Sequence, residues 1–152
     1  MNPAAPDGVY YKRSRFATRL PADRLYTASH FWLFEAEPGR WRVGLTKFAA
    51  RMLGDVVDLG FEVASGDQIA LGQTIGWLEG FKARTDLYSV LTGRFEGGNP
   101  RLETDIDVVD RDRYGEGWLY SVRGTPDPNA TGVEGYVAVL DATIDRMRGK
   151  TT

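Results

Sequence analysis

The stretch IGWLEGFKARTDLY, residues 75–88, places a single lysine, Lys82, between two apolar and turn-rich flanks. Side chains alternate in character before the lysine, which predicts one β-strand, and the apolar residues after it predict a second. Gly80 and Phe81 precede the lysine and Ala83 follows it, so Lys82 falls at or near the apex of a predicted β-hairpin. A side chain at this position should point into water. The question is what role a single lysine has there.

The first strand of this hairpin is expected to present Ile75, Trp77 and Glu79 on one face, because side chains alternate along a strand. Gly76 and Leu78 then fall on the other face. The second strand is expected to run through DLYSVLTGRF and to end at the glycine of that stretch. The two flanks of the lysine resemble each other in their order of strand, turn and glycine, which suits a flattened barrel with pseudo-two-fold symmetry.

Composition excludes several classes of function. The 152 residues are enough for one domain with a modest core, and 42% of them are hydrophobic, as in globular proteins. A net charge of −2 gives no electrostatic reason to expect nucleic acid, and no apolar run is long enough for a membrane span. The absence of cysteine excludes disulfides, thiolate nucleophiles and cysteine zinc sites. The single histidine, His30, cannot form a multi-histidine metal site and is expected to be structural.

The N-terminal segment, residues 1–24, is basic and contains three prolines. It is expected to form an irregular arm on the surface rather than an amphipathic targeting helix, which its prolines would interrupt. No secretory apolar region is visible, so the cytoplasm is the default compartment. Residues 25–149 are expected to form one domain, because no linker is long enough to divide them.

Before the hairpin, two strands are predicted around the turn EPG within RLYTASHFWLFEAEPGRWRVGL. A short helix follows, with Thr46 as its N-cap and Gly54 at its end. The face that this helix turns inward is expected to hold Phe48, Met52 and Leu53.

After the hairpin, the acidic stretch ETDIDVVDRDRYGEG is expected to be a loop with one short strand inside it, and WLYSVRG is expected to be a strand. Residues 133–148 predict a helix, because Val137, Leu140, Ile144 and Met147 recur at helical spacing. The fold is therefore predicted to be mostly β, with one short internal helix and one C-terminal helix.

Four segments, in order, resemble the H protein of the glycine cleavage system, which is a lipoyl carrier. LYTASHFW is similar to the family pattern Y-x-x-S-H-E-W, and VGLTKFAARMLGDVV to V-G-[IL]-T-x-x-A-x-x-x-L-G-D-[IV]-V. LEGFKARTDLYSVLTG is similar to E-S-V-K-A-x-S-D-[LI]-Y-[AS]-P-x-[ST]-G, and DRYGEGWLYSV to D-P-Y-G-E-G-W-[LI]. The resemblance extends from about residue 25 to residue 122, with a looser helical tail.

The resemblance implies a fold and a cofactor. The fold is a barrel-sandwich hybrid of the lipoyl- and biotinyl-carrier type, and lipoate is attached to Lys82 through an amide. A lipoate ligase or a lipoyl or octanoyl transferase would form that amide. The resemblance further implies a carrier rather than an enzyme, serving the P, T and L proteins of glycine cleavage or analogous enzymes. No nucleophile–base pair can be assembled from the residues, which agrees with this expectation.

The resemblance also implies a cleft for the lipoyl arm. Ser29 and Asp86 occupy family positions that line this cleft, and Phe31 replaces a family glutamate there. A phenyl ring attracts a cation by about 0.5–1 kcal/mol, less than a carboxylate can. Glu79, Gly80 and Phe81 are candidates for recognition by the attaching enzyme. Neither catalytic nor metal-binding residues are expected at this site.

Two alternatives remain open from the residues. The chain could be an H-like lipoate-binding protein of another pathway, such as bacterial sulfur oxidation, because Phe31 alters the cleft and the segment between Asp55 and Gly66 is short for the family. It could also be an unmodified interaction module, with Phe31 and Phe81 as an apolar docking patch. Biotin carriers usually place methionines beside their lysine, which this chain does not.

Overall fold

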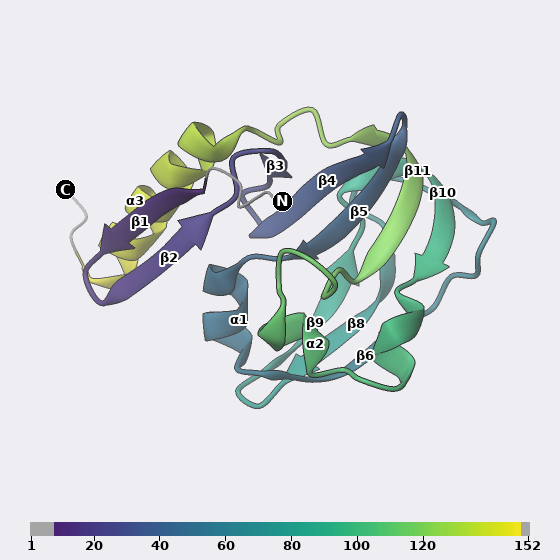
Figure 1. Cartoon of the computed structure of the whole chain (residues 1–152), viewed down its shortest axis with the longest axis horizontal. Helices are drawn as coiled ribbons and strands as arrows, with labels where there is room; N and C mark the ends of the chain where they lie inside the picture. The colour runs from purple at the N-terminus through teal and green to yellow at the C-terminus, as the bar shows by residue number, and fades with distance from the viewer. Residues whose placement is uncertain (1–7, 150–152) are drawn as a thin grey trace, which may run out of the picture.

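The computed structural model describes residues 8–149 (Figure 1). Its strands and helices, in chain order, are β1 (Val9–Arg13), β2 (Phe16–Leu20), β3 (Leu25–Tyr26), β4 (Phe31–Glu37), β5 (Arg40–Leu45), α1 (Lys47–Leu53), β6 (Val56–Phe61), β7 (Gln68–Ile69), β8 (Thr74–Gly80), β9 (Arg84–Tyr88), β10 (Leu91–Gly98), the 3-10 helix η1 (Pro100–Glu103), α2 (Val108–Arg111), β11 (Tyr120–Pro126) and α3 (Val133–Met147). The predicted mostly β fold with a short internal helix and a C-terminal helix is confirmed.

Two antiparallel sheets enclose the main core. The larger has the strand order β3-β4-β5-β11-β10-β7, and the smaller has the order β6-β8-β9. Leu33 and Val43 of the larger sheet belong to the same buried cluster as Leu78 and Leu87 of the smaller sheet, and all four are fully buried. Burial of such side chains is the main force that holds the two sheets together.

The segments before the hairpin form largely as the sequence predicts, but a turn at residues 27–30 divides the first predicted strand into β3 and β4. Strands β4 and β5 pair across a turn at Gly39, whose φ of +79° favours glycine. Thr46 caps α1 by accepting a hydrogen bond from the backbone N–H of Ala49, and Gly54 ends the helix at a φ of +80°. The prediction for Met52 is wrong, because this side chain is 49% exposed at the edge of the helix.

The hairpin around Lys82 differs in two details from the prediction. A bulge at Ile75 shifts the register of β8, so Ile75 joins Leu78 in the core instead of sharing a face with Trp77. The strand after the lysine ends at Tyr88 rather than continuing to Gly93. Ser89 interrupts the strand there, because its hydroxyl donates a hydrogen bond to the Leu91 carbonyl and accepts one from the Leu91 N–H. The chain then enters the larger sheet as β10.

The strand predicted inside residues 103–117 is wrong. The chain there forms η1 and α2, joined by turns. Asn99 accepts a hydrogen bond from the N–H of Arg101 and starts η1, with Pro100 in its first turn. Val108 and Val109 are both buried in α2, where consecutive residues both reach the core.

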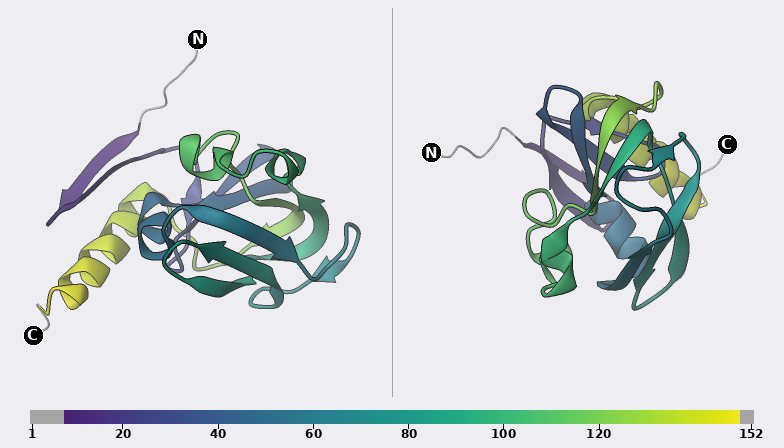
Figure 2. Two further views of the ribbon diagram at one scale, coloured as in Figure 1. Left: turned by 90° about the horizontal axis from the view of Figure 1, so that it is seen from below. Right: turned by 90° about the vertical axis from the view of Figure 1, so that its right-hand side faces the viewer.

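The expectation of an irregular N-terminal arm is also wrong for the described part of residues 1–24. Strands β1 and β2 form a hairpin that lies against α3, away from the six-stranded and three-stranded sheets (Figure 2). Tyr11, Phe16 and Leu20 point into a second core cluster, and the Tyr11 hydroxyl donates a 2.7 Å hydrogen bond to Asp141 of α3. The basic residues that alternate with these side chains concealed the strand pattern in the sequence.

Helix α3 agrees with the prediction in its extent and in its end at Gly149, whose φ is +75°. Its buried face is formed by Val133, Tyr136, Leu140 and Ile144. Met147 was expected on that face but is 59% exposed. Among residues 8–149, no helix combines the length and the apolarity that crossing a bilayer requires.

Candidate functional site

Lys82 lies at the tip of the β8–β9 hairpin, and its backbone is fixed there. The Gly80 N–H donates to the Ala83 carbonyl across the turn, at 2.9 Å. The Lys82 N–H donates to the Leu53 carbonyl at 2.8 Å, and the Phe81 N–H to the Asp55 carbonyl at 3.1 Å. The tip is therefore attached to the end of α1 and to the residues that follow it, and is not a free loop.

Two glycines make this attachment possible. A Cβ atom on Gly80 would lie 2.2 Å from the Leu53 carbonyl oxygen, so only glycine allows the hairpin to approach the end of α1. Gly54 has a positive φ, and a Cβ atom added there would lie 2.9 Å from the backbone nitrogen of Lys82. Gly80 was a candidate for recognition by an attaching enzyme, and the structure also gives it a packing reason.

The Lys82 side chain is exposed, and its Nζ donates a 3.1 Å hydrogen bond to the Arg51 carbonyl. That carbonyl belongs to the last turn of α1, where carbonyls lack partners within the helix and carry partial negative charge. A single hydrogen bond between exposed groups is weak in water. The Lys82 amine is therefore held in a defined place but is easily released.

The other recognition candidates differ in exposure. Phe81 is 79% exposed beside the lysine, as an apolar side chain that another protein could contact. Glu79 is half-buried and lies 3.8 Å from Arg84, whose guanidinium is 5.2 Å from the Trp77 ring. Glu79 thus takes part in an ion pair on the hairpin surface.

The three cleft candidates meet in one pocket of about 350 Å³. It is lined by Ser29, His30, Phe31, Leu45, Ala49, Met52, Leu53, Leu78, Thr85, Asp86 and Tyr88. Leu53, which accepts the Lys82 backbone hydrogen bond, is part of this lining, so the pocket begins beside the hairpin tip. The fold brings together residues far apart in the sequence, from 29 to 88, and their role in holding a lipoyl arm stays a prediction.

The pocket is mostly apolar with a few polar groups. Among the residues that line it, Asp86 carries the only carboxylate, and the Tyr88 hydroxyl lies 3.5 Å from an Asp86 oxygen. The Ser29 hydroxyl is 2.8 Å from that of Thr27. Such a surface can hold an apolar chain and direct one cationic or hydrogen-bonding end towards Asp86. Thr85 and Tyr88 were missed by the sequence reasoning, although Tyr88 lies two residues after Asp86 and therefore on the same face of β9.

His30 organises one end of this pocket and is not a free base. Its φ is +74°, its Nδ1 lies 2.9 Å from the Tyr136 hydroxyl, and its ring is 4.7 Å from that of Phe48. The Tyr136 hydroxyl also lies 2.8 Å from the hydroxyl of Thr46, the N-cap of α1. Burial lowers the pKa of His30 to about 4, so the imidazole is neutral at physiological pH.

No group of three or more potential metal-ligating side chains is found in the described part of the chain. The site therefore consists of an accessible amine on a fixed hairpin, next to a largely apolar pocket.

A prediction about pH follows from His30. Because its folded pKa of about 4 lies below its unfolded value near 6.5, the unfolded chain binds more protons between these values. The stability is fully present above pH 6.5 and falls as the pH drops towards 4, by on the order of 1–3 kcal/mol from this group. Urea unfolding at several pH values measures it.

His30→Asn is the matched control, because asparagine tolerates a positive φ and does not titrate. Carboxylates titrate equally in both proteins, so the difference between the two unfolding curves isolates His30. A difference that does not change between pH 7 and pH 4 would contradict the buried, neutral histidine.

Comparison with known proteins supports one family. The sequence model described as "Glycine cleavage H-protein" matches residues 24–135. The glycine cleavage system H protein of Mycolicibacterium smegmatis is 39% identical over 134 residues, covering 81% of this chain and 98% of that protein. That of Shewanella oneidensis is 32% identical over 132 residues, covering 82% and 98%.

A solved structure agrees with the family model and with these two relatives. The crystal structure of a glycine cleavage system H protein from Mycobacterium marinum superimposes with a TM-score of 0.71 at 31% identity, covering 80% of this chain and 99% of that one. The family match, the relatives and the shared fold lead to the same assignment. The chain belongs to the glycine cleavage H-protein family.

Proposed function

We propose that this chain is the lipoyl carrier of glycine cleavage, with lipoate attached by an amide to Lys82. Members of the H-protein family are carriers and not enzymes, and the same holds for this chain. The observation that supports Lys82 most is its exposed amine at a hairpin tip that is hydrogen-bonded to the end of α1. We expect the protein to work in the cytoplasm.

The fixed hairpin would serve the attachment reaction. A lipoate ligase, or a lipoyl or octanoyl transferase, needs the amine of Lys82 free and presented in one orientation. Breaking one exposed hydrogen bond to the Arg51 carbonyl frees the amine, while the backbone bonds to Leu53 and Asp55 keep the tip in place. The exposed ring of Phe81 and the half-buried Glu79 lie next to the lysine for recognition.

The attached arm would then shuttle between partner enzymes. Lysyl and lipoyl chains together have about eleven single bonds and reach on the order of 14 Å. Tethering gives an effective concentration of the order of mM near a partner. The partners would be the P, T and L proteins of glycine cleavage. When bound, lipoate supplies a dithiol that carries the aminomethyl group.

The pocket beside the hairpin would shelter the arm between transfers. Its apolar lining suits the hydrocarbon chain, and Asp86 and Ser29 offer oxygen atoms to the amine of the cargo. Phe31 stands where the family pattern has a glutamate, so the pocket offers one carboxylate and an aromatic face instead of two carboxylates. We infer a weaker hold on the cationic cargo than two carboxylates would give.

The alternatives receive no support. The relatives reported above are named glycine cleavage system H proteins, and no observation favours another pathway or an unmodified docking module.

Attachment at Lys82 predicts a mass. Intact protein from its native host should be heavier than the sequence by about 188 Da, which is lipoic acid minus water. Lys82→Arg should lack this increment and lose all carrier activity, while Lys47→Arg, on the surface of α1, should keep both. An unmodified wild-type mass while glycine cleavage is active would contradict the proposal.

The role of Phe31 predicts a change in cargo retention. Phe31→Glu should slow the spontaneous loss of the aminomethyl group from the loaded carrier by about threefold to tenfold, because a second carboxylate pairs with the cation. Phe31→Gln introduces a side chain of the same size as glutamate but without charge, and it should not slow this loss. Asp86→Asn should accelerate the loss. Equal loss rates for the glutamate and glutamine variants would show that charge at this position is irrelevant.

A further inference from the structure

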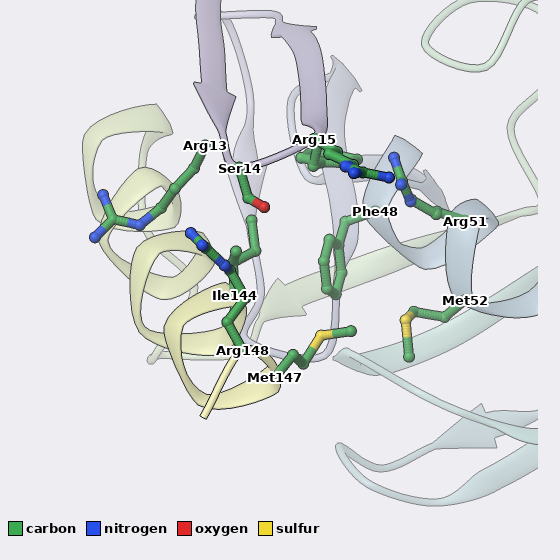
Figure 3. Close-up of a pocket in the computed structure, with 10 residues that line it drawn as sticks. Arg13, Ser14, Arg15, Phe48, Arg51, Met52, Ile144, Met147 and Arg148 are labelled. Carbon is green, nitrogen blue, oxygen red and sulfur yellow. The ribbon is translucent and has the colours of Figure 1, made fainter. Parts of the chain in front are cut away.

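A second pocket, of about 270 Å³, lies where the turn of the β1–β2 hairpin, helix α1 and the end of α3 meet (Figure 3). It is lined by Arg13, Ser14, Arg15, Phe16, Phe48, Arg51, Met52, Ile144, Met147 and Arg148. Most of this lining is outside the family match at residues 24–135, since only the three residues from α1 lie within it. The carrier function of the family therefore does not account for this pocket.

The pocket combines an apolar floor with a cationic rim. Phe16, Phe48 and Ile144 are buried beneath it. Four arginines and no carboxylate are among the lining residues. Arg13 is already paired, at 3.3 Å from Asp141 and 2.7 Å from Asp145. Within residues 8–149, Arg15, Arg51 and Arg148 make no ion pair, and they carry the remaining positive charge of the rim.

These three arginines lie on separate elements around the opening. Arg15 is in the turn of the β1–β2 hairpin, Arg51 is on α1, and Arg148 follows α3 (Figure 3). The guanidinium of Arg51 lies 5.7 Å from the centre of the Phe16 ring, so it stands over the apolar floor. An anionic group that enters here would meet guanidinium groups from several directions, and these can bind carboxylates through paired hydrogen bonds.

The pocket adjoins the site at Lys82. The carbonyl of Arg51 accepts the hydrogen bond from the Lys82 amine, while the side chain of Arg51 lines this second pocket. Met52 lines both this pocket and the cleft that contains Asp86. Anything bound at the second pocket would therefore be next to the base of the tether.

The exposed edge of the pocket favours a side chain of a protein over a small molecule. Pockets for small ligands usually bury most of the ligand. The edge of this pocket is formed by Met52 and Met147, which are 49% and 59% exposed. Exposed methionines adapt their shape to an incoming apolar group, as is common at protein-binding surfaces. An apolar anchor surrounded by a charged rim is the usual arrangement at the centre of an interface.

We propose that this pocket docks a partner enzyme of the glycine cleavage system through an acidic surface segment. An apolar side chain of that segment, flanked by carboxylates, would enter the pocket between Arg15, Arg51 and Arg148. The proposal rests on the carrier function proposed above, and it adds how one enzyme is held while the arm on Lys82 reaches its active site. The β1–β2 hairpin is then a docking element that this chain has in addition to the matched family domain.

The test uses the full, lipoylated chain, verified by intact mass, with the P, T and L proteins of its own organism. The KM of each enzyme for the carrier is measured with wild type, Arg15→Glu, Arg148→Glu and the control Lys12→Glu. Lys12 is exposed on the same hairpin and does not line the pocket. For one enzyme, each arginine variant should raise KM about tenfold at low ionic strength with kcat unchanged, and Lys12→Glu by less than about twofold.

Several results would overturn the docking proposal. One is an equal KM for Arg15→Glu, Arg148→Glu and Lys12→Glu with all three enzymes, although the carrier is lipoylated and turns over. Another is a wild-type dimer that Arg15→Glu makes monomeric in sedimentation, which would assign the pocket to a second copy. A third is saturable, micromolar binding of octanoate followed by the methyl resonances of Met52 and Met147. A carrier without the lipoyl mass would refute the proposed function instead, so the two failures are distinguishable.

Discussion

The hairpin that carries Lys82 closes the C-terminal end of α1, and the site depends on this contact. A helix leaves its last carbonyls without partners, and here the Lys82 backbone N–H bonds the Leu53 carbonyl while its amine bonds that of Arg51. Gly80 allows this approach because any Cβ would collide with the Leu53 carbonyl. One lysine thus completes a helix with its backbone and still leaves its amine available. The proposed conversion of the amine to an amide would remove its charge and leave the backbone contact intact.

Helix α1 also lies between the core of the two main sheets and the second core cluster, which contains α3 and the β1–β2 hairpin. At its other end, Thr46 caps α1 and touches the hydroxyl of Tyr136, which also contacts His30 at the rim of the cleft. Helix α3 is therefore connected to the cleft through the hydrogen bonds of Tyr136 with Thr46 and His30. Helix α1 also separates the cleft from the arginine-rimmed pocket, with Met52 contributing to both. A partner seated on one side would be next to the arm on the other.

The sequence predicted those features that depend on local chemistry. The position of Lys82 between two strands, the cap at Thr46, the stop at Gly54 and the extent of α3 all follow from side-chain periodicity and glycine conformation. The meeting of Ser29, Phe31 and Asp86 in one cleft needed the resemblance to a family, because no local pattern relates residues so far apart in the chain.

Other features could not be predicted because they arise from tertiary contacts. The bulge at Ile75 depends on pairing with β9, and two adjacent valines, at 108 and 109, fit a buried helix as well as a strand. Tyr11 of β1 and Phe16 of β2 become core residues only because α3 supplies an apolar surface for them. The arginine-rimmed pocket likewise exists only after β1–β2, α1 and α3 have come together.

We propose that close contact between the hairpin and the end of α1 presents Lys82 for modification. The most direct measurement is the rate at which a lipoate ligase modifies purified Gly80→Ala, compared with Gly132→Ala, where a Cβ meets nothing within 4 Å. The added methyl group at position 80 must push the tip away from the Leu53 carbonyl, although the lysine itself is unchanged. We expect kcat/KM for lipoylation to fall by about tenfold or more in Gly80→Ala and to stay near wild type in Gly132→Ala. Equal rates for the two variants, both folded, would contradict it.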